Sequence, residues 1–179
     1  MGPMQKILAN KNILNAIWFQ LGWWALVLSA SYKMELLGFA ISLCLIAIHF
    51  GFIANNLKKD IFTLICCGGL GVSGDFILIQ FEIIQTQNSL SLFPIWLIGL
   101  WFLFPITLNY SLAWSLKGHL IKPLVAIGAA GSYFAGKSFE ILYLKEPIFE
   151  SFLVITAVWW IYFLLFEKTI IRLNQRFST

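Results

Sequence analysis

Six long apolar runs dominate this sequence and constrain its fold more than any other feature. A helix needs about 20 mostly apolar residues to cross the roughly 30 Å hydrocarbon core of a bilayer. The chain is 60% hydrophobic and 11% charged, whereas soluble domains carry about 25% charged residues. The runs therefore predict six transmembrane helices, at Ile13–Ala30, Leu36–Ala54, Ile61–Phe81, Leu92–Trp114, Ile121–Leu144 and Ile148–Phe166.

The predicted fold is an all-α membrane protein, a six-transmembrane-helix bundle in a single domain. The short connections make neighbouring helices antiparallel hairpins and leave no room for a domain outside the membrane. Strands are not expected, because transmembrane strands alternate apolar and polar residues over about 10 positions and these runs are continuous. Residues 1–3 resemble a cloning remnant, so the domain is expected over residues 4–179. Pro105 predicts a kink in the fourth helix.

Basic residues are distributed unevenly between the runs, and this predicts orientation because cytoplasmic loops are enriched in Lys and Arg. With the N-terminus in the cytoplasm, only Lys33 and Lys145 fall in outside loops. Six crossings return the C-terminus to the cytoplasm, so both termini are expected there. The basic residues then placed inside are Lys6, Lys11, Lys58, Lys59, Lys117, Lys122, Lys168, Arg172 and Arg176.

Several classes of protein are disfavoured by what the sequence lacks. The net charge of +4 does not indicate a nucleic-acid partner, since the basic residues form no stripe with interleaved aromatics. The three cysteines form no CxxC pair or Cys/His zinc spacing, so no metal or cofactor is expected. No nucleophile elbow, HExxH or P-loop motif is present. Membrane lipids are the expected partners, while enzymatic activity and oligomeric state stay open.

Small residues recur along two of the predicted helices. Gly128, Ser132 and Gly136 are spaced by four in the fifth helix, and Gly71 and Gly74 belong to a glycine cluster in the third. Lipid provides no hydrophobic drive for helix association, so small residues let helices approach closely. These five residues are expected to pack helices together, and the alternative is a channel for a lipid chain or substrate.

Ionisable residues inside a membrane are costly and either pair with one another or mark a functional site. Asp75 and Lys137 have matching depths in the third and fifth helices. They are therefore expected either to form an ion pair or to meet a substrate, ion or proton. Asp75 and His49 are the catalytic candidates, although His49 also fits a hydrogen-bonding role. A polar core or ligand site is expected from Asn15, Gln20, Asp75, Asn109, Tyr133 and Lys137.

Several short motifs together resemble a bacterial inner-membrane family, the domain of unknown function 2878 family. They include Trp18–Trp24 in the first helix, Gly71–Asp75 in the third, Asn109–Trp114 in the fourth and Gly131–Gly136 in the fifth. Pro94-Ile95-Trp96 and Trp101 extend the similarity, which covers nearly the whole chain.

Two features depart from the family pattern. The expected proline near Gly131-Ser132 is missing, and Lys137 and Glu140 replace expected small residues. An ion pair through Lys137 is therefore expected to be particular to this chain.

The resemblance implies a place in the bacterial inner membrane and a role in membrane-lipid chemistry. Genes of this family often adjoin genes for cyclopropane-fatty-acid-synthase-like methyltransferases and flavin oxidoreductases. The leading hypothesis is therefore support of fatty-acyl or membrane-lipid modification, as an enzyme or as a lipid-binding partner of lipid-modifying enzymes. One alternative is a small proton- or ion-coupled transporter, and another is a membrane scaffold for other enzymes.

Overall fold

The structure is a computed structural model that describes residues 3–86 and 93–177, with side chains from residue 10 onward. Residues 1 and 2, expected to be a cloning remnant, and Leu92, the predicted start of the fourth helix, lie outside this range. The α-helices in the described residues are α1 (Pro3–Ser31), α2 (Glu35–Ile48), α3 (Leu57–Gln80), α4 (Ile95–Leu103), α5 (Ile121–Ser138) and α6 (Ile148–Phe177). The shorter elements are the π-helix η1 (His49–Ile53), the 3-10 helices η2 (Pro105–Asn109) and η3 (Ala113–Leu116), and strands β1 (Ile84–Thr86) and β2 (Leu142–Leu144).

Four helical stretches are long and apolar enough to cross a membrane: Asn10–Ser31, Glu35–Ile53, Leu57–Gln80 and Ile148–Phe177. Most of each stretch faces outward, with large apolar side chains on the surface. Water disfavours a continuous apolar surface of this kind, whereas lipid accommodates it. The helical, membrane-compatible character of the fold is therefore confirmed, while the number of crossings stays a prediction.

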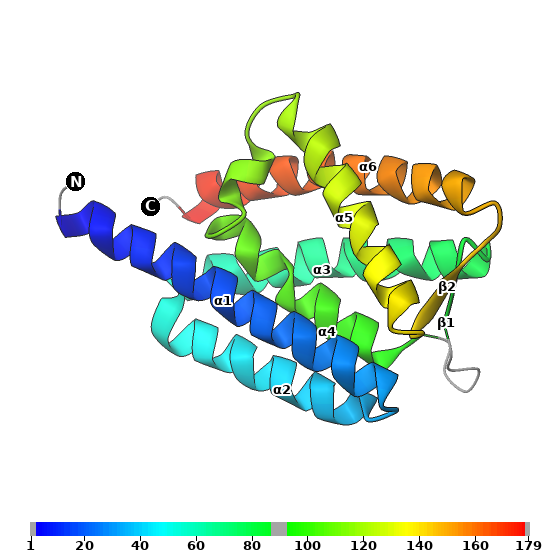
Figure 1. Cartoon of the computed structure of the whole chain (residues 1–179). Helices are drawn as coiled ribbons and strands as arrows, with labels where there is room; N and C mark the ends of the chain where they lie inside the picture. The colour runs from blue at the N-terminus through cyan, green and yellow to red at the C-terminus, as the bar shows by residue number, and fades with distance from the viewer. Residues whose placement is uncertain (1–2, 87–92, 178–179) are drawn as a thin grey trace.

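The helices pack around α4, which contacts α1, α2 and α3. α1 and α2 form an antiparallel hairpin, while α6 packs against α3 and α5 (Figure 1). α5 crosses obliquely over the bundle, and the two ends of the chain lie at the same end of the molecule. Aromatic side chains fill the space between α4 and α6, where Trp101 stacks on Trp159 with ring centroids 5.1 Å apart.

The fourth predicted helix is interrupted instead of kinked. Because Pro105 has no N–H to donate, the α-helix ends at Leu103 and the chain continues as the 3-10 helix η2. The apolar helical stretch Ile95–Asn109 is accordingly shorter than the predicted crossing. The predicted continuous helix through Trp114 is therefore wrong.

The fifth predicted helix is also too long, and the expectation of no strands is wrong. α5 ends at Ser138, and Glu140 then adopts a left-handed backbone with φ 57°. The chain turns into β2, which pairs antiparallel with β1 so that Ile84 faces Leu144. This small sheet ties the connection after α3 to the connection after α5.

Candidate functional site

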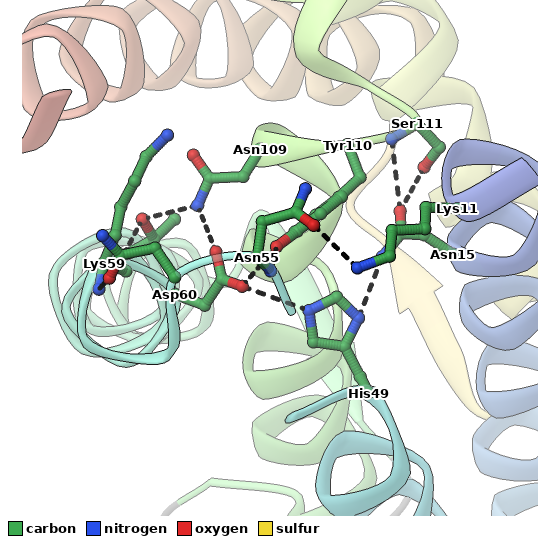
Figure 2. A network of polar contacts seen from close by, with 11 residues as sticks. Lys11, Asn15, His49, Asn55, Lys59, Asp60, Asn109, Tyr110 and Ser111 are labelled. Atoms are coloured by element: carbon green, nitrogen blue, oxygen red, sulfur yellow. Dashed lines mark hydrogen bonds and ion pairs between the residues drawn. The ribbon is translucent and has the colours of Figure 1, made fainter. Parts of the chain in front are cut away.

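A buried polar network lies where α1, η1, the start of α3 and the residues after η2 meet (Figure 2). Its centre is Asp60, which is 1% exposed. Asn56 caps α3 by accepting a hydrogen bond from the Lys59 N–H at 3.0 Å, so the helix begins at Leu57 and Asp60 lies in its first turn. An acidic side chain there is favoured by the helix dipole.

Three side chains surround the Asp60 carboxylate. The Tyr110 hydroxyl donates to Oδ2 at 2.6 Å, and the Asn109 Nδ2 amide donates to Oδ1 at 2.8 Å. His49 Nε2 lies 3.5 Å from Oδ2. The Tyr110 oxygen in turn accepts from the Asn55 N–H at 2.8 Å. The carboxylate therefore joins α3 to η1 and to the end of η2.

His49 links this carboxylate to α1. Its side chain is fully buried, and it is the first residue of the π-helix η1, a conformation often found at functional sites. His49 Nδ1 lies 3.5 Å from Asn15 Nδ2. Asn15 Oδ1 accepts from the Ser111 hydroxyl at 2.5 Å and from the Ser111 N–H at 3.3 Å. Three predicted site residues, Asn15, His49 and Asn109, thus share one network.

Tyr110 lies just beyond the apolar stretch that ends at Asn109. Burial raises the pKa of its hydroxyl well above the usual range, and the hydrogen bond to Asp60 raises this pKa further. The hydroxyl therefore remains protonated at physiological pH and keeps its role as the donor to Asp60.

A second polar centre surrounds Asp75, whose side chain is fully buried in α3. The Tyr133 hydroxyl of α5 donates to Oδ1 at 2.6 Å, and Trp101 Nε1 of α4 donates to Oδ2 at 2.7 Å. Among the described residues, no ion pair joins Asp75 to half-buried Lys137, so the structure does not show the first of the two alternatives predicted for them. The two aromatic donors occupy the carboxylate oxygens instead.

An apolar cavity of about 700 Å³ lies between α1, α4, α5 and α6. Trp101 connects the cavity to the second polar centre, because the indole ring lines the cavity while the indole N–H donates a hydrogen bond to Asp75. Trp114 and Leu124 on the cavity wall are 52% and 68% exposed, so the cavity is open to the surroundings of the bundle. Gln20 and Ser132 are the polar non-aromatic side chains that line it.

The predicted small residues divide between packing and the cavity. A side chain at Gly71 would collide with the Trp101 ring, and one at Gly74 would collide with Tyr162. Gly136 lies against Leu142, where an added Cβ would be 2.7 Å from Cδ2. Gly128, by contrast, meets nothing within 4 Å and lines the cavity with Ser132. The packing role predicted for Gly128 stays a prediction, since no other helix lies against it in the described residues.

Sequence reasoning missed several residues of these sites. Asp60 follows Lys58 and Lys59, and this charged run resembles the solvated end of a helix. Asn56 is a preferred N-cap residue, so the sequence did contain a signal that the helix begins there and that Asp60 lies in its first turn.

The Lys122–Glu167 ion pair, 3.2 Å long, was also missed. Lys122 is 1% exposed, although it was predicted only as a basic residue on the cytoplasmic side at the start of the fifth helix. In the described parts of the chain, no group of three or more His, Cys, Asp or Glu could hold a metal ion.

The chain has the features of a small helical membrane protein. They are long apolar helices, buried polar centres and a cavity that opens to the surroundings of the bundle. Residues 12–165 match the family described as "Protein of unknown function (DUF2878)". The chain belongs to this family, as its motifs indicated. No curated protein and no solved structure matches the chain.

Proposed function

We propose that this protein binds a membrane lipid by an acyl chain in the cavity between α1 and α5. In this proposal it supports fatty-acyl or membrane-lipid modification, either as the enzyme or as a lipid-binding partner. The single observation that carries the proposal is the apolar cavity of about 700 Å³ with exposed wall residues. Binding pockets for small molecules occupy about 300–1,000 Å³, so the space suits a lipid chain.

The chemistry of the wall favours an acyl chain over a polar solute. Most of the lining is aromatic or aliphatic, and the open edge includes Trp114 and Leu124. Gly128 leaves free space on the α5 side. A chain entering from the surrounding lipid would exchange one apolar environment for another and would need no polar partner.

The enzyme form of this proposal assigns acid–base chemistry to Asp75. Trp101 supports that assignment because it contacts both the carboxylate and the cavity. The lipid-partner form needs only the cavity. A comparison of acyl species in cells with and without the gene distinguishes the two forms when Asp75→Asn is included. Loss of a product in Asp75→Asn cells with normal protein levels supports the enzyme form.

A small proton- or ion-coupled transporter is the second candidate. Asp60 and Asp75 are both buried and both belong to α3. Fifteen residues of helix separate them by about 22 Å, so one helix carries ionisable groups at two depths. Proton-dependent uptake into proteoliposomes is the test of this candidate, and loss of uptake in Asp75→Asn is its expected result.

The proposal also includes six crossings in the bacterial inner membrane with both termini in the cytoplasm. The position of both chain ends at one end of the molecule supports an even number of crossings. The excess of basic residues on the side of the termini supports the cytoplasmic assignment.

Native mass spectrometry of the purified protein tests lipid binding directly. The wild-type protein is expected to retain a lipid, and Gly128→Trp is expected to lower its occupancy at least tenfold because the indole fills the cavity. Gly69→Trp is the matched control, since Gly69 also meets nothing within 4 Å but does not line the cavity. Equal lipid occupancy in the two folded variants contradicts the proposal.

A further inference from the structure

The orientation of the Asn15 side-chain amide is fixed by its neighbours. Ser111 offers a backbone N–H, which can only donate, and this group lies 3.3 Å from Asn15 Oδ1. The Ser111 hydroxyl donates to the same oxygen. Turning the amide over would place Nδ2 against a donor, so Oδ1 must face Ser111 and Nδ2 must face His49.

This orientation determines which nitrogen of His49 carries the proton. Asn15 Nδ2 presents hydrogens to Nδ1, so Nδ1 must be the acceptor and the neutral ring must carry its proton on Nε2. Nε2 lies 3.5 Å from Asp60 Oδ2, within ion-pair range, and makes no hydrogen bond to any of the described residues. The network therefore fits a neutral imidazole between one amide and one carboxylate.

We propose that His49 and Asp60 form a proton-binding site whose occupancy controls the contact between α1 and the Tyr110–Leu112 segment. A proton from the aqueous phase adds to Nδ1, and no other covalent bond changes. The imidazolium then presents two N–H groups. Its Nε2–H is attracted to Asp60, but its Nδ1–H opposes the Asn15 amide hydrogens. Asn15 must then move away from His49 or turn over, and either change displaces Oδ1 from Ser111 because one planar amide makes both sets of contacts.

The site borders the lipid cavity, and this part of the inference rests on the proposed function. Phe19 lies one turn beyond Asn15 on the same face of α1, and Leu112 follows Ser111. Both Phe19 and Leu112 line the cavity. Separation of Asn15 from Ser111 therefore opens the end of the cavity nearest the polar network.

The charged and titratable groups around His49 come from each element packed against it. Asp60 of α3 favours the added proton, and the Tyr110 ring packs edge-on at a centroid distance of 5.0 Å. Lys11 of α1 reaches the site through its 2.7 Å bond to Asn55. Lys59 adjoins Asp60 in α3. The two lysines oppose the added proton, while Asp60 Oδ2 lies 3.5 Å from the ring nitrogen Nε2 and favours it.

Pulsed electron spin resonance measures the proposed separation without requiring a bound lipid. Spin labels at Ile13→Cys and Leu120→Cys report on α1 and on the loop that leads from the Tyr110–Leu112 segment to α5, since these side chains are 58% and 84% exposed. The native cysteines are replaced by alanine. Between about pH 7.5 and about pH 5.5, where histidine ordinarily titrates, the mean distance is expected to increase by about 1–2 Å, a typical helix shift.

Three variants assign the shift to this site. His49→Gln is expected to abolish it, while His119→Gln is the matched control because His119 is the chain's other histidine and is exposed in a loop. Asn15→Asp is expected to abolish it as well, because a carboxylate accepts from both Ser111 and Nδ1–H. Asn15→Asp keeps the inference testable should His49→Gln fail to fold.

The outcomes separate this inference from the proposed function. A distance that does not change with pH in the wild-type protein, or that still changes in Asn15→Asp, overturns the proton site. Lipid occupancy is measured on the same samples by native mass spectrometry. A pH-dependent distance without lipid at either pH supports the proton site and contradicts lipid binding in the cavity. Lipid that stays bound equally at both pH values, despite the distance change, overturns the proposed control of the cavity.

Discussion

Asp75 shows how a carboxylate can be accommodated inside an apolar bundle without a basic partner. Trp101 and Tyr133 each donate a hydrogen bond to one of its oxygens. The two donors differ, because an indole N–H can only donate whereas a phenol oxygen can also accept. This difference decides which substitutions the site tolerates.

Asp75→Asn is expected to keep the protein folded, with a loss of less than about 1 kcal/mol in the free energy of unfolding. The amide oxygen accepts from Trp101, and the amide nitrogen donates to the Tyr133 oxygen. Asp75→Leu leaves both aromatic donors unpaired, at a cost of about 1–3 kcal/mol for each buried group. Thermal unfolding in detergent compares the two variants, and equal losses would show that these hydrogen bonds do not determine stability.

Individual polar residues could be selected from the sequence, but their partners could not. Asn15, His49 and Asn109 were predicted from the cost of polar groups in lipid, and all three belong to the buried network. The contacts through Asp60 and Ser111 depend on how each helix is rotated, which depth alone does not specify. For the same reason, depth alone could not decide between the two alternatives for Asp75 and Lys137. In the structure, Trp101 and Tyr133 face the Asp75 carboxylate.

Three helices end in the same backbone motif at one end of the bundle. Lys33, Glu82 and Glu140, after α1, α3 and α5, have φ angles of 59°, 58° and 57°. After α3 the Ile83 N–H bonds Leu78 O at 2.9 Å, as in a Schellman cap, where glycine is usual. The sequence has charged residues at these positions, whereas glycine would have indicated the end of a helix. The fifth helix was therefore predicted to continue past Ser138.

Glu82→Gly is expected to stabilise the protein by about 0.5–1 kcal/mol. A left-handed conformation costs a non-glycine residue about 1–2 kcal/mol, while glycine loses about 0.5–1 kcal/mol through its greater freedom in the unfolded chain. Gln80→Gly is the control within the last turn of α3 and should destabilise by about 1 kcal/mol. Thermal unfolding in detergent measures both, and a destabilised Glu82→Gly would contradict the cap assignment.

For the whole molecule, hydropathy predicted six helices where the described residues form the six α-helices, but not how far each one extends. Four helical stretches keep enough apolar length to cross a bilayer, whereas α4 is interrupted at Pro105 and α5 is followed by a strand. The β1–β2 pairing places the connections after α3 and α5 at the same end of the bundle. The number of crossings therefore depends on the residues between α4 and α5, which reach the opposite membrane face if the chain crosses six times.

Cysteine labelling answers that question at the loop that contains His119, where the side chains of residues 117–120 are exposed. With six crossings, His119→Cys reacts with a membrane-impermeant maleimide only after the cytoplasmic face is opened, while Lys33→Cys reacts in intact cells. Both are made in a chain whose three native cysteines are replaced by alanine. If α4 and α5 instead form a re-entrant hairpin inside the bilayer, His119→Cys stays unreactive on both faces while Lys33→Cys still reacts. Reaction of His119→Cys in intact cells would contradict the predicted orientation, because the loop would then share a face with Lys33.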